Sequence, residues 1–168
     1  MPLIKNGALL EDTFTSVVDD TPMPVNGSIV SLSRFARERH SLLARNAPLG
    51  VRLQSSESPE SLGEDVHRLS VVALEFPKFR DGRGFSWARM LRSRLGYTGE
   101  IRAVGDYLYD QIAFMHRVGI DAFEVRENFT LAEFRRALGE ITDVYQPSAD
   151  GRKTIPQLRA QAPHKPGA

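Results

Sequence analysis

Short apolar runs alternate with longer amphipathic segments along most of the chain, and this alternation predicts a series of βα units. Between residues 71 and 128 the same pattern occurs three times: an apolar run, a loop rich in Gly, Asp and Arg, and a helix of about 10 to 15 residues. The three apolar runs are Val71–Glu75, Ile101–Val104 and Ala122–Val125. Polar residues follow each run, at the edge of a parallel sheet where α/β folds collect their binding and catalytic groups.

Further elements precede and separate these units. Apolar runs at residues 29–32 and 49–53 predict two earlier strands, which makes five in all. Asn6 and Gly7 favour a type I′ turn, so a small hairpin is expected over residues 3–10. The expected helices cover residues 33–44, 60–69, 85–95, 108–118 and 130–138.

Capping residues and side-chain periodicity add detail to two of these helices. Ser33 is the expected cap of the first helix, with Arg34 on its solvent side. Thr130 and Glu133 form a capping box at the start of the last one. A stripe at helical spacing, expected in the core, comprises Leu108, Ile112, Phe114 and Met115.

The pattern divides the chain into one α/β domain with a segment at each end. We expect an N-terminal hairpin and linker over residues 1–27, the α/β domain over 28–145 and a mobile tail over 146–168. The linker is dense in turn-forming residues, and the tail is rich in proline and poor in apolar residues.

Strands that alternate with helices predict a mostly parallel sheet, either a partial (β/α) barrel or an open doubly wound sheet. Four strands each carry one charge, and the signs alternate along the chain: Arg52, Glu75, Arg102 and Glu124. In a barrel, neighbours in sequence are neighbours in space, so these residues would form a ladder of opposite charges on one face. This favours the barrel. The ladder is either a structural network or the lining of a binding cavity in which Arg102 is the anion ligand.

Composition restricts the function. The chain has 168 residues, 22 basic and 21 acidic, and its net charge of +1 indicates neither nucleic acid nor an anionic membrane as a partner. The absence of cysteine excludes thiol redox chemistry and cysteine-ligated metal clusters. We find neither a signal-peptide pattern nor a long apolar stretch, and we therefore expect a soluble cytoplasmic protein.

The most unusual local sequence is residues 76–87, which joins a strand to a helix. Its glycines allow a close backbone approach, and a helix N-terminus with cations nearby suits an oxyanion or a phosphate. The candidate anion ligands there are Lys78, Arg80, Arg83 and Ser86. In the alternative interpretation Asp81 and Gly82 form a tight turn, and Arg83 pairs with Asp81 or Asp106 to fix the loop.

Two more loops belong to the same edge of the sheet. Asp106 is either the N-cap of a helix or a group that orients Arg83 or a ligand. The supporting polar residues are Glu75, Asp81, Asp110, Gln111, Glu124 and Arg126. No histidine is spaced to complete a metal site, and no catalytic residue or cofactor is indicated. Trp87 stands where a dinucleotide fingerprint has its third glycine, which argues against a nicotinamide cofactor.

At three segments, residues 73–86, 102–111 and 117–123, the chain resembles a family of small proteobacterial proteins of unknown function, the DUF934 type. Members are often labelled oxidoreductases of sulfite reduction and are typically encoded beside assimilatory sulfite reductase. The resemblance implies a role in making sulfide for cysteine synthesis, with sulfite reductase as a partner.

Two hypotheses remain open. The first is an accessory protein that binds sulfite reductase through the arginine-rich loop, Trp87, Tyr107 and Tyr109. The second is a small enzyme or binding protein, an oxidoreductase of sulfur assimilation, whose loops hold an oxyanion or a phosphorylated ligand. We favour the first, because the residues that chemistry requires are missing whereas those for binding are present.

Overall fold

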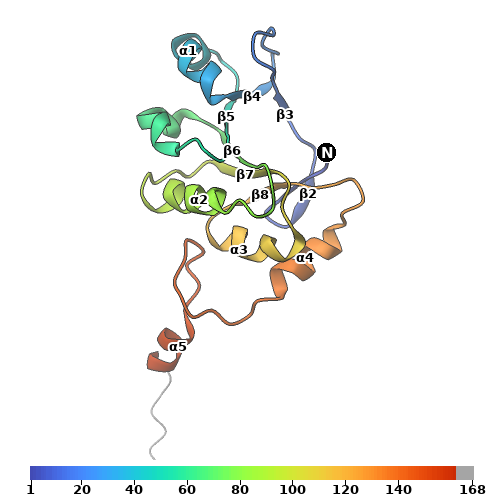
Figure 1. Cartoon of the computed structure of the whole chain (residues 1–168), viewed down its shortest axis with the longest axis vertical. Coiled ribbons are helices and arrows are strands. Elements are labelled where there is room, and N and C mark those ends of the chain that lie inside the picture. Colours follow the sequence, from blue (N-terminus) through green and yellow to red (C-terminus); the bar gives the residue numbers. More distant parts are fainter. Residues whose placement is uncertain (162–168) are drawn as a thin grey trace, which may run out of the picture.

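The computed structural model describes residues 1–161 of the chain (Figure 1). The strands are β1 (Leu3–Lys5), β2 (Ala8–Leu10), β3 (Phe14–Ser16), β4 (Gly27–Ser31), β5 (Leu49–Leu53), β6 (Val71–Phe76), β7 (Glu100–Gly105) and β8 (Ala122–Glu124). The α-helices are α1 (Leu32–Leu43), α2 (Arg83–Ser93), α3 (Ile112–Arg117), α4 (Leu131–Gly139) and α5 (Ile155–Gln161). Two 3₁₀ segments, η1 (Pro59–Arg68) and η2 (Tyr109–Gln111), complete the described elements.

The strands form one curled sheet in the order β2-β1-β8-β7-β6-β5-β4-β3. From β3 to β8 each strand pairs in parallel with the next one along the chain, whereas β1 runs antiparallel to both β8 and β2. A doubly wound sheet would reverse its strand order, so the predicted half-barrel is confirmed. The five predicted strands correspond to β4–β8, and the hairpin at residues 3–10 is also confirmed, with positive φ at Asn6 and Gly7.

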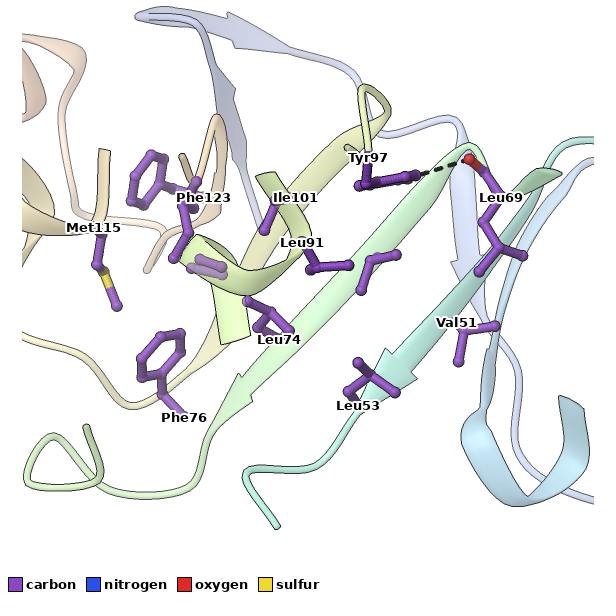
Figure 2. Packing of buried hydrophobic residues seen from close by; sticks show 14 of the residues in the cluster. Val51, Leu53, Leu69, Leu74, Phe76, Leu91, Tyr97, Ile101, Met115 and Phe123 are labelled. Atoms are coloured by element: carbon purple, nitrogen blue, oxygen red, sulfur yellow. Dashed lines mark hydrogen bonds between the residues drawn. The ribbon is translucent and has the colours of Figure 1, made fainter. Parts of the chain in front are cut away.

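One face of the sheet is covered by helices. Alternate residues of the central strands meet Leu91 of α2 and Met115 of α3 in a continuous apolar core (Figure 2). The strand residues of this helix-covered face include Val51, Leu53, Val72, Leu74, Ile101 and Phe123. All of them are less than 2% exposed, so the helices are held to the sheet by apolar burial.

The opposite face carries the charges. The register places Arg52, Ala73, Arg102 and Ala122 on one rung across β5–β8. Because side chains alternate along a strand, Glu75 and Glu124, two residues after rung members, lie on the same face. The predicted clustering of the four strand charges on one face is therefore confirmed. Glu100, two residues before Arg102, lies on the same face, which we call the charged face.

Helix α1 starts differently from the prediction. Its cap is Ser31, whose side chain accepts a hydrogen bond from the Arg34 amide at 3.1 Å, and not Ser33. The Arg34 side chain is buried rather than solvated: it donates to the Val18 and Thr21 carbonyls at 3.1 and 2.8 Å. Arg34 thereby fixes the irregular linker before β4 to helix α1.

The helix after β7 also starts later than predicted. Residues 106–108 are extended or bent, η2 begins at Tyr109, and Asp106 is therefore not a helix cap. Of the predicted core stripe, Ile112 and Met115 are buried, but Leu108 and Phe114 are 41% and 47% exposed. The capping box at Thr130 and Glu133 is confirmed, with hydrogen bonds of 2.7 and 3.2 Å.

After α4 the chain returns to the body of the fold. Asp150 forms an ion pair with Arg117 at 3.0 Å, and the Ser148 hydroxyl donates to the Arg117 carbonyl at 2.8 Å. Helix α5 lies within the predicted tail, whose mobility stays a prediction. The end of that tail, residues 162–168, lies outside the described residues.

Candidate functional site

The loop between β6 and α2 is fixed from within by Arg83. The Arg83 guanidinium donates to Asp81 through Nε at 2.9 Å and through Nη2 at 2.6 Å, and Nη2 also reaches the Ser55 hydroxyl at 2.9 Å. The hydrogen bond from Arg83, helped by the one from Ser55, holds the pKa of Asp81 well below its usual value. The structure thus contains the predicted pair of Arg83 with Asp81, and not a pair of Arg83 with Asp106.

Two other cations of this loop, unlike Arg83, are not engaged by a carboxylate in the described part of the chain. Lys78 and Arg80 are exposed, and neither forms an ion pair within residues 1–161. The Arg80 guanidinium lies 5.4 Å from the centroid of the Phe79 ring, a cation–π contact. An open cavity of about 420 Å³ lies beside the loop, lined by Pro77, Lys78, Arg80, Asp81 and Arg83. Ser86 is also exposed, one turn into α2.

Gln111 ties this loop to the next one. Its side-chain oxygen accepts from the Leu108 amide at 2.9 Å, and its side-chain nitrogen donates to the Phe79 carbonyl at 2.8 Å. The Asp106 amide adds a bond of 2.7 Å to the Phe76 carbonyl. The loops after β6 and β7 are therefore cross-linked, which is a structural role for a predicted supporting residue.

Exposed apolar side chains gather around this cross-link. Phe79 is 38% exposed, Leu108 is 41% exposed, and Phe114, one helical turn after Gln111, is 47% exposed. The Phe114 ring also lies 5.2 Å from the ring of Phe85. We call the set of Phe79, Leu108, Phe114, Lys78 and Arg80 the Phe79 surface.

The aromatic residues predicted for a partner surface are held inward instead. The Trp87 indole donates to the Ser55 carbonyl at 3.0 Å, and the Tyr107 hydroxyl donates to the Glu124 carbonyl at 2.6 Å. Trp87, Tyr107 and Tyr109 are half-buried and pack against the main core. The sequence predicts Phe114 in the core and these three residues on the surface. The structure shows the reverse, because residue type alone does not tell a buried aromatic side chain from an exposed one.

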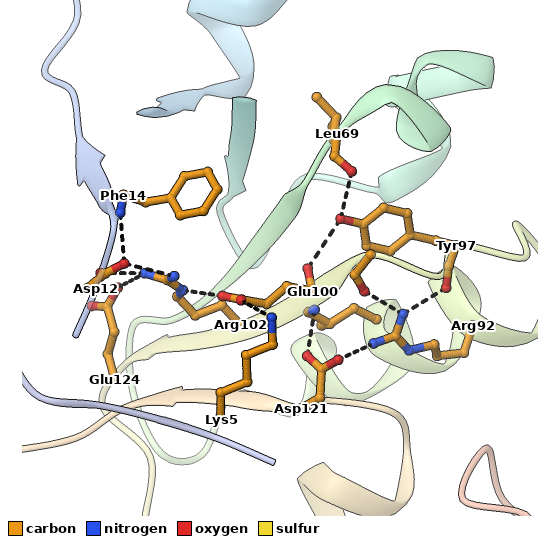
Figure 3. Close-up of polar contacts among 12 residues, drawn as sticks. Lys5, Asp12, Phe14, Leu69, Arg92, Tyr97, Glu100, Arg102, Asp121 and Glu124 are labelled. Atoms are coloured by element: carbon orange, nitrogen blue, oxygen red, sulfur yellow. Dashed lines mark hydrogen bonds and ion pairs between the residues drawn. The ribbon is translucent and has the colours of Figure 1, made fainter. Parts of the chain in front are cut away.

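The charged face has Arg102 at its centre (Figure 3). This side chain is 1% exposed and donates to Glu100 at 2.7 Å, to both oxygens of Asp12 at 2.7 and 3.1 Å, and to Glu124 at 3.3 Å. Lys5 pairs with Glu100 at 2.8 Å. Burial would lower the pKa of Arg102, but the hydrogen bonds that Arg102 donates to Asp12 and Glu100 more than offset this and raise it. Arg102 is therefore charged at any physiological pH.

The predicted ladder of charges forms in part. Arg52 meets Glu75 at 3.0 Å and Arg102 meets Glu124 at 3.3 Å, but Glu75 forms no ion pair with Arg102. Glu75 lies beside Val104 in the register, whereas Arg102 lies beside Ala73. Carboxylates already occupy the donors of Arg102, which favours the structural-network interpretation over a free anion ligand.

A second polar network lies where β7 begins. Arg92 of α2 donates to the carbonyls of Tyr97, Gly99 and Gly119 at 2.7, 2.7 and 3.0 Å, and to Asp121 at 3.0 Å (Figure 3). Asp121 in turn accepts from the Ile101 amide at 2.9 Å, and burial raises its pKa. This network explains one of the segments that carry the family resemblance, residues 117–123, as a structural feature.

The remaining predicted residues lie near the ends of β7 and β8. Asp106 pairs with Arg126 at 3.4 Å, and the two side chains are 46% and 79% exposed. Glu124 and Arg126 border a cavity of about 200 Å³ there. Asp110 is exposed on η2. The structure therefore distributes the predicted site residues over four places: the β6–α2 loop with the first turn of α2, the charged face, η2 with Asp110 and Gln111, and the ends of β7 and β8.

The described residues add two negative findings. Within residues 1–161, no group of three or more histidine, cysteine, aspartate or glutamate residues is arranged to hold a metal ion. In that same part of the chain, no helix has the length and apolar character needed to cross a membrane.

Comparison with known proteins identifies one family. Residues 50–155 match the family described as "Bacterial protein of unknown function (DUF934)". No curated protein and no solved structure matches the chain. The matched region runs from β5 to the start of α5 and includes the β6–α2 loop, Gln111, Arg102 and the cavity at β7 and β8. Because the match covers more than half of the chain, the protein belongs to this DUF934 family of bacterial proteins.

Proposed function

We propose that this protein is an accessory protein of assimilatory sulfite reduction that docks on sulfite reductase through the Phe79 surface. The choice of partner rests on the family resemblance of residues 73–86, 102–111 and 117–123. The choice of surface rests on one observation: three large apolar side chains are exposed around a loop whose cations Lys78 and Arg80 have no ion-pair partner within residues 1–161.

The loop is preorganised for docking. Asp81 and Arg83 fix it from one side, and Gln111 holds the Phe79 carbonyl from the other. A surface that is ordered before binding loses little conformational entropy when a partner arrives. Aromatic and arginine side chains at the centre of such a patch are the residue types that most often dominate binding energy. The partner face should therefore be acidic, with an apolar pocket for Phe79.

The alternative is a small oxyanion- or phosphate-binding enzyme. The open cavity beside Lys78 and Arg80 is the observation in its favour. Against it, Asp81 and Ser55 already engage Arg83, the cation best placed at the start of α2. An anion there would meet two flexible exposed side chains and no buried donor, so we rank this function second.

The test combines binding with turnover. Purified protein is titrated into sulfite reductase with its natural electron donor, and complex formation is measured in parallel by surface plasmon resonance. We expect saturation near a stoichiometric ratio. Phe79→Ala and Arg80→Glu should each weaken binding by about tenfold or more, which is the effect of losing a hot-spot residue. Arg37→Ala, at an exposed arginine of α1, is the control, because Figure 1 shows α1 well apart from α2 and α3.

The possible outcomes test the choice of surface and the choice of partner separately. Binding by the wild-type protein that neither variant weakens would refute the Phe79 surface. No binding by the wild-type protein at any ratio would refute sulfite reductase as the partner. Saturable sulfite or phosphate binding that Arg80→Glu abolishes would support the second function instead.

A further inference from the structure

The cavity at the ends of β7 and β8 has no part in the proposed docking surface. It has a volume of about 200 Å³, and its wall contains Tyr107, Tyr109, Ile112, Val125 and Phe129. Arg126 also lines this cavity. In an α/β fold, the carboxyl ends of parallel strands are where ligands bind, and an apolar cavity with a few polar groups is the usual form of such a site.

One wall of the cavity is rigid. The Tyr107 hydroxyl is fixed on the Glu124 carbonyl at 2.6 Å, and its ring packs edge-on against Phe76 and Phe123 at centroid distances of 6.1 and 6.2 Å. Burial, with the nearby Glu124 carboxylate, raises the pKa of Tyr107, so the phenol stays neutral. This wall is therefore an uncharged aromatic surface that is formed before a ligand arrives.

Two further lining residues are also aromatic. Tyr109 and Phe129 lie with their ring centroids 6.4 Å apart, and both line the cavity. Gly105, which also lines the cavity, allows the backbones of β6 and β7 to lie close together there: its φ is +101°, and a Cβ would lie 2.4 Å from the Phe76 carbonyl oxygen. A cavity lined by aromatic rings selects planar apolar groups, which gain from edge or offset contacts.

Arg126 supplies the charge. Its side chain is 79% exposed, and its partner Asp106 is 3.4 Å away and 46% exposed. An exposed ion pair of this kind contributes about 0–1 kcal/mol, so a ligand anion can displace it at little cost. The other charged group at the cavity, Glu124, is already compensated by Arg102 at 3.3 Å. The cavity therefore combines aromatic and aliphatic lining residues with one weakly paired cation.

The volume limits the size of the ligand. Pockets for drug-sized ligands have about 300–1,000 Å³, and this cavity is smaller. It has room for one ring but not for a dinucleotide. We propose that this cavity binds a single-ring aromatic anion, with the ring against the aromatic lining of Tyr107, Tyr109 and Phe129 and the anionic group on Arg126.

The test uses three probes and calorimetry on the full chain. Benzoate carries both the ring and the charge, benzyl alcohol carries the ring alone, and acetate carries the charge alone. We expect benzoate to bind most tightly, benzyl alcohol more weakly and acetate not at all. Arg126→Gln should reduce benzoate affinity by about tenfold, to the level of benzyl alcohol, because a charge-assisted hydrogen bond is lost.

Two further variants make the result decisive. Arg37→Gln removes an exposed arginine of α1, a helix that contributes no residue to the cavity, and should leave benzoate affinity unchanged. Phe129→Leu keeps the wall apolar but removes a ring, and it should weaken benzoate and benzyl alcohol equally; circular dichroism checks its fold. Absence of saturable benzoate binding to the wild-type protein, or equal affinity in the wild-type protein and Arg126→Gln, would overturn the proposal. Neither result depends on whether sulfite reductase is the partner.

Discussion

The two faces of the half-barrel are stabilised in different ways. The helix-covered face is a continuous apolar core in which residues such as Leu74 and Leu91 are almost fully buried. The charged face has a small apolar cluster, and its largest buried side chain is Arg102, surrounded by carboxylates. On the helix-covered face, many weak apolar contacts together supply the stabilisation. On the charged face, the stabilisation comes from a few charged groups, each of which compensates the others.

This difference predicts how each face responds to mutation. An apolar core loses energy in proportion to the contacts that are removed, and its neighbours can relax. A buried network of charges fails more abruptly, because each member that is removed leaves its partners desolvated and unpaired. The following four predictions, from the largest expected effect to the smallest, test that contrast.

Arg102→Ala should have the largest effect. It leaves Glu100 without its guanidinium partner and removes the counter-charge of Asp12 and Glu124. Breaking a buried ion pair in this way costs about 3–5 kcal/mol of unfolding free energy. Urea unfolding followed by the fluorescence of the single tryptophan measures the loss. A loss near zero would mean that the network contributes nothing to stability.

Leu74→Ala tests the helix-covered face at a comparable depth. The side chain is 1% exposed, and its removal leaves a cavity beneath the helices. We expect a loss of about 3 kcal/mol in the same urea experiment. Combined with Arg102→Ala, the two losses should be close to additive, because the side chains lie on opposite faces of the sheet. Strong coupling would show that the faces are not independent.

Asp12→Asn removes one charge but keeps the shape of the side chain. Asp12 is 26% exposed and bonds to two nitrogens of Arg102, so water partly replaces what is lost. We expect a loss of about 1–2 kcal/mol. A double-mutant cycle with Arg102→Met isolates the contact, and a coupling energy near zero would contradict the network described for the charged face.

Arg52→Ala is the matched control for Arg102→Ala. Arg52 is on the same face and also pairs with a glutamate, but its side chain is 47% exposed. A pair in contact with water contributes about 0–1 kcal/mol, so we expect a change of at most about 0.5 kcal/mol. A loss as large as that of Arg102→Ala would show that burial does not decide the value of these charges.

Much of the fold is predictable from local signals. The strands β4–β8 follow from short apolar runs, the hairpin from Asn6 and Gly7, and the start of α4 from Thr130 and Glu133. The choice of a barrel over a doubly wound sheet followed from the alternating charges of four strands. Each of these signals either lies within a few residues or recurs in successive strands, so it can be recognised in the sequence.

The errors occur where packing overrides local pattern. Leu108 and Phe114 were assigned to the core on helical spacing, but the chain is extended at Leu108 and passes through a 3₁₀ turn before α3, which changes the direction of each side chain. Helical periodicity predicts Arg34 on the solvent side of α1. The carbonyls that bury it belong to an irregular linker, whose position a periodic pattern cannot predict.

The charged face was predictable only in part. Arg102 and Glu124 were identified from their strands, but Lys5 and Asp12 were not, because they come from the N-terminal segment and no spacing rule connects them to β7. The β6–α2 loop follows the carboxyl end of β6, as the sequence pattern predicts, whereas its role in binding stays a prediction. The division of its cations between Arg83, which fixes the loop, and Arg80, which is exposed, required the structure.

The pairing of β1 with β8 has a consequence for how the chain is made. Strand β1 precedes the other strands of the sheet in the chain, but it pairs with β8, the last of them, and Asp12 binds Arg102, 90 residues further along. Until β8 is made, Ile4, which is fully buried in the folded protein, has only its hairpin partner Leu9 of β2 beside it on the sheet. Contacts this distant in sequence form late and slow the folding reaction. Strand β1 is thus synthesised before the rest of the sheet, yet it is among the last strands to reach its final place.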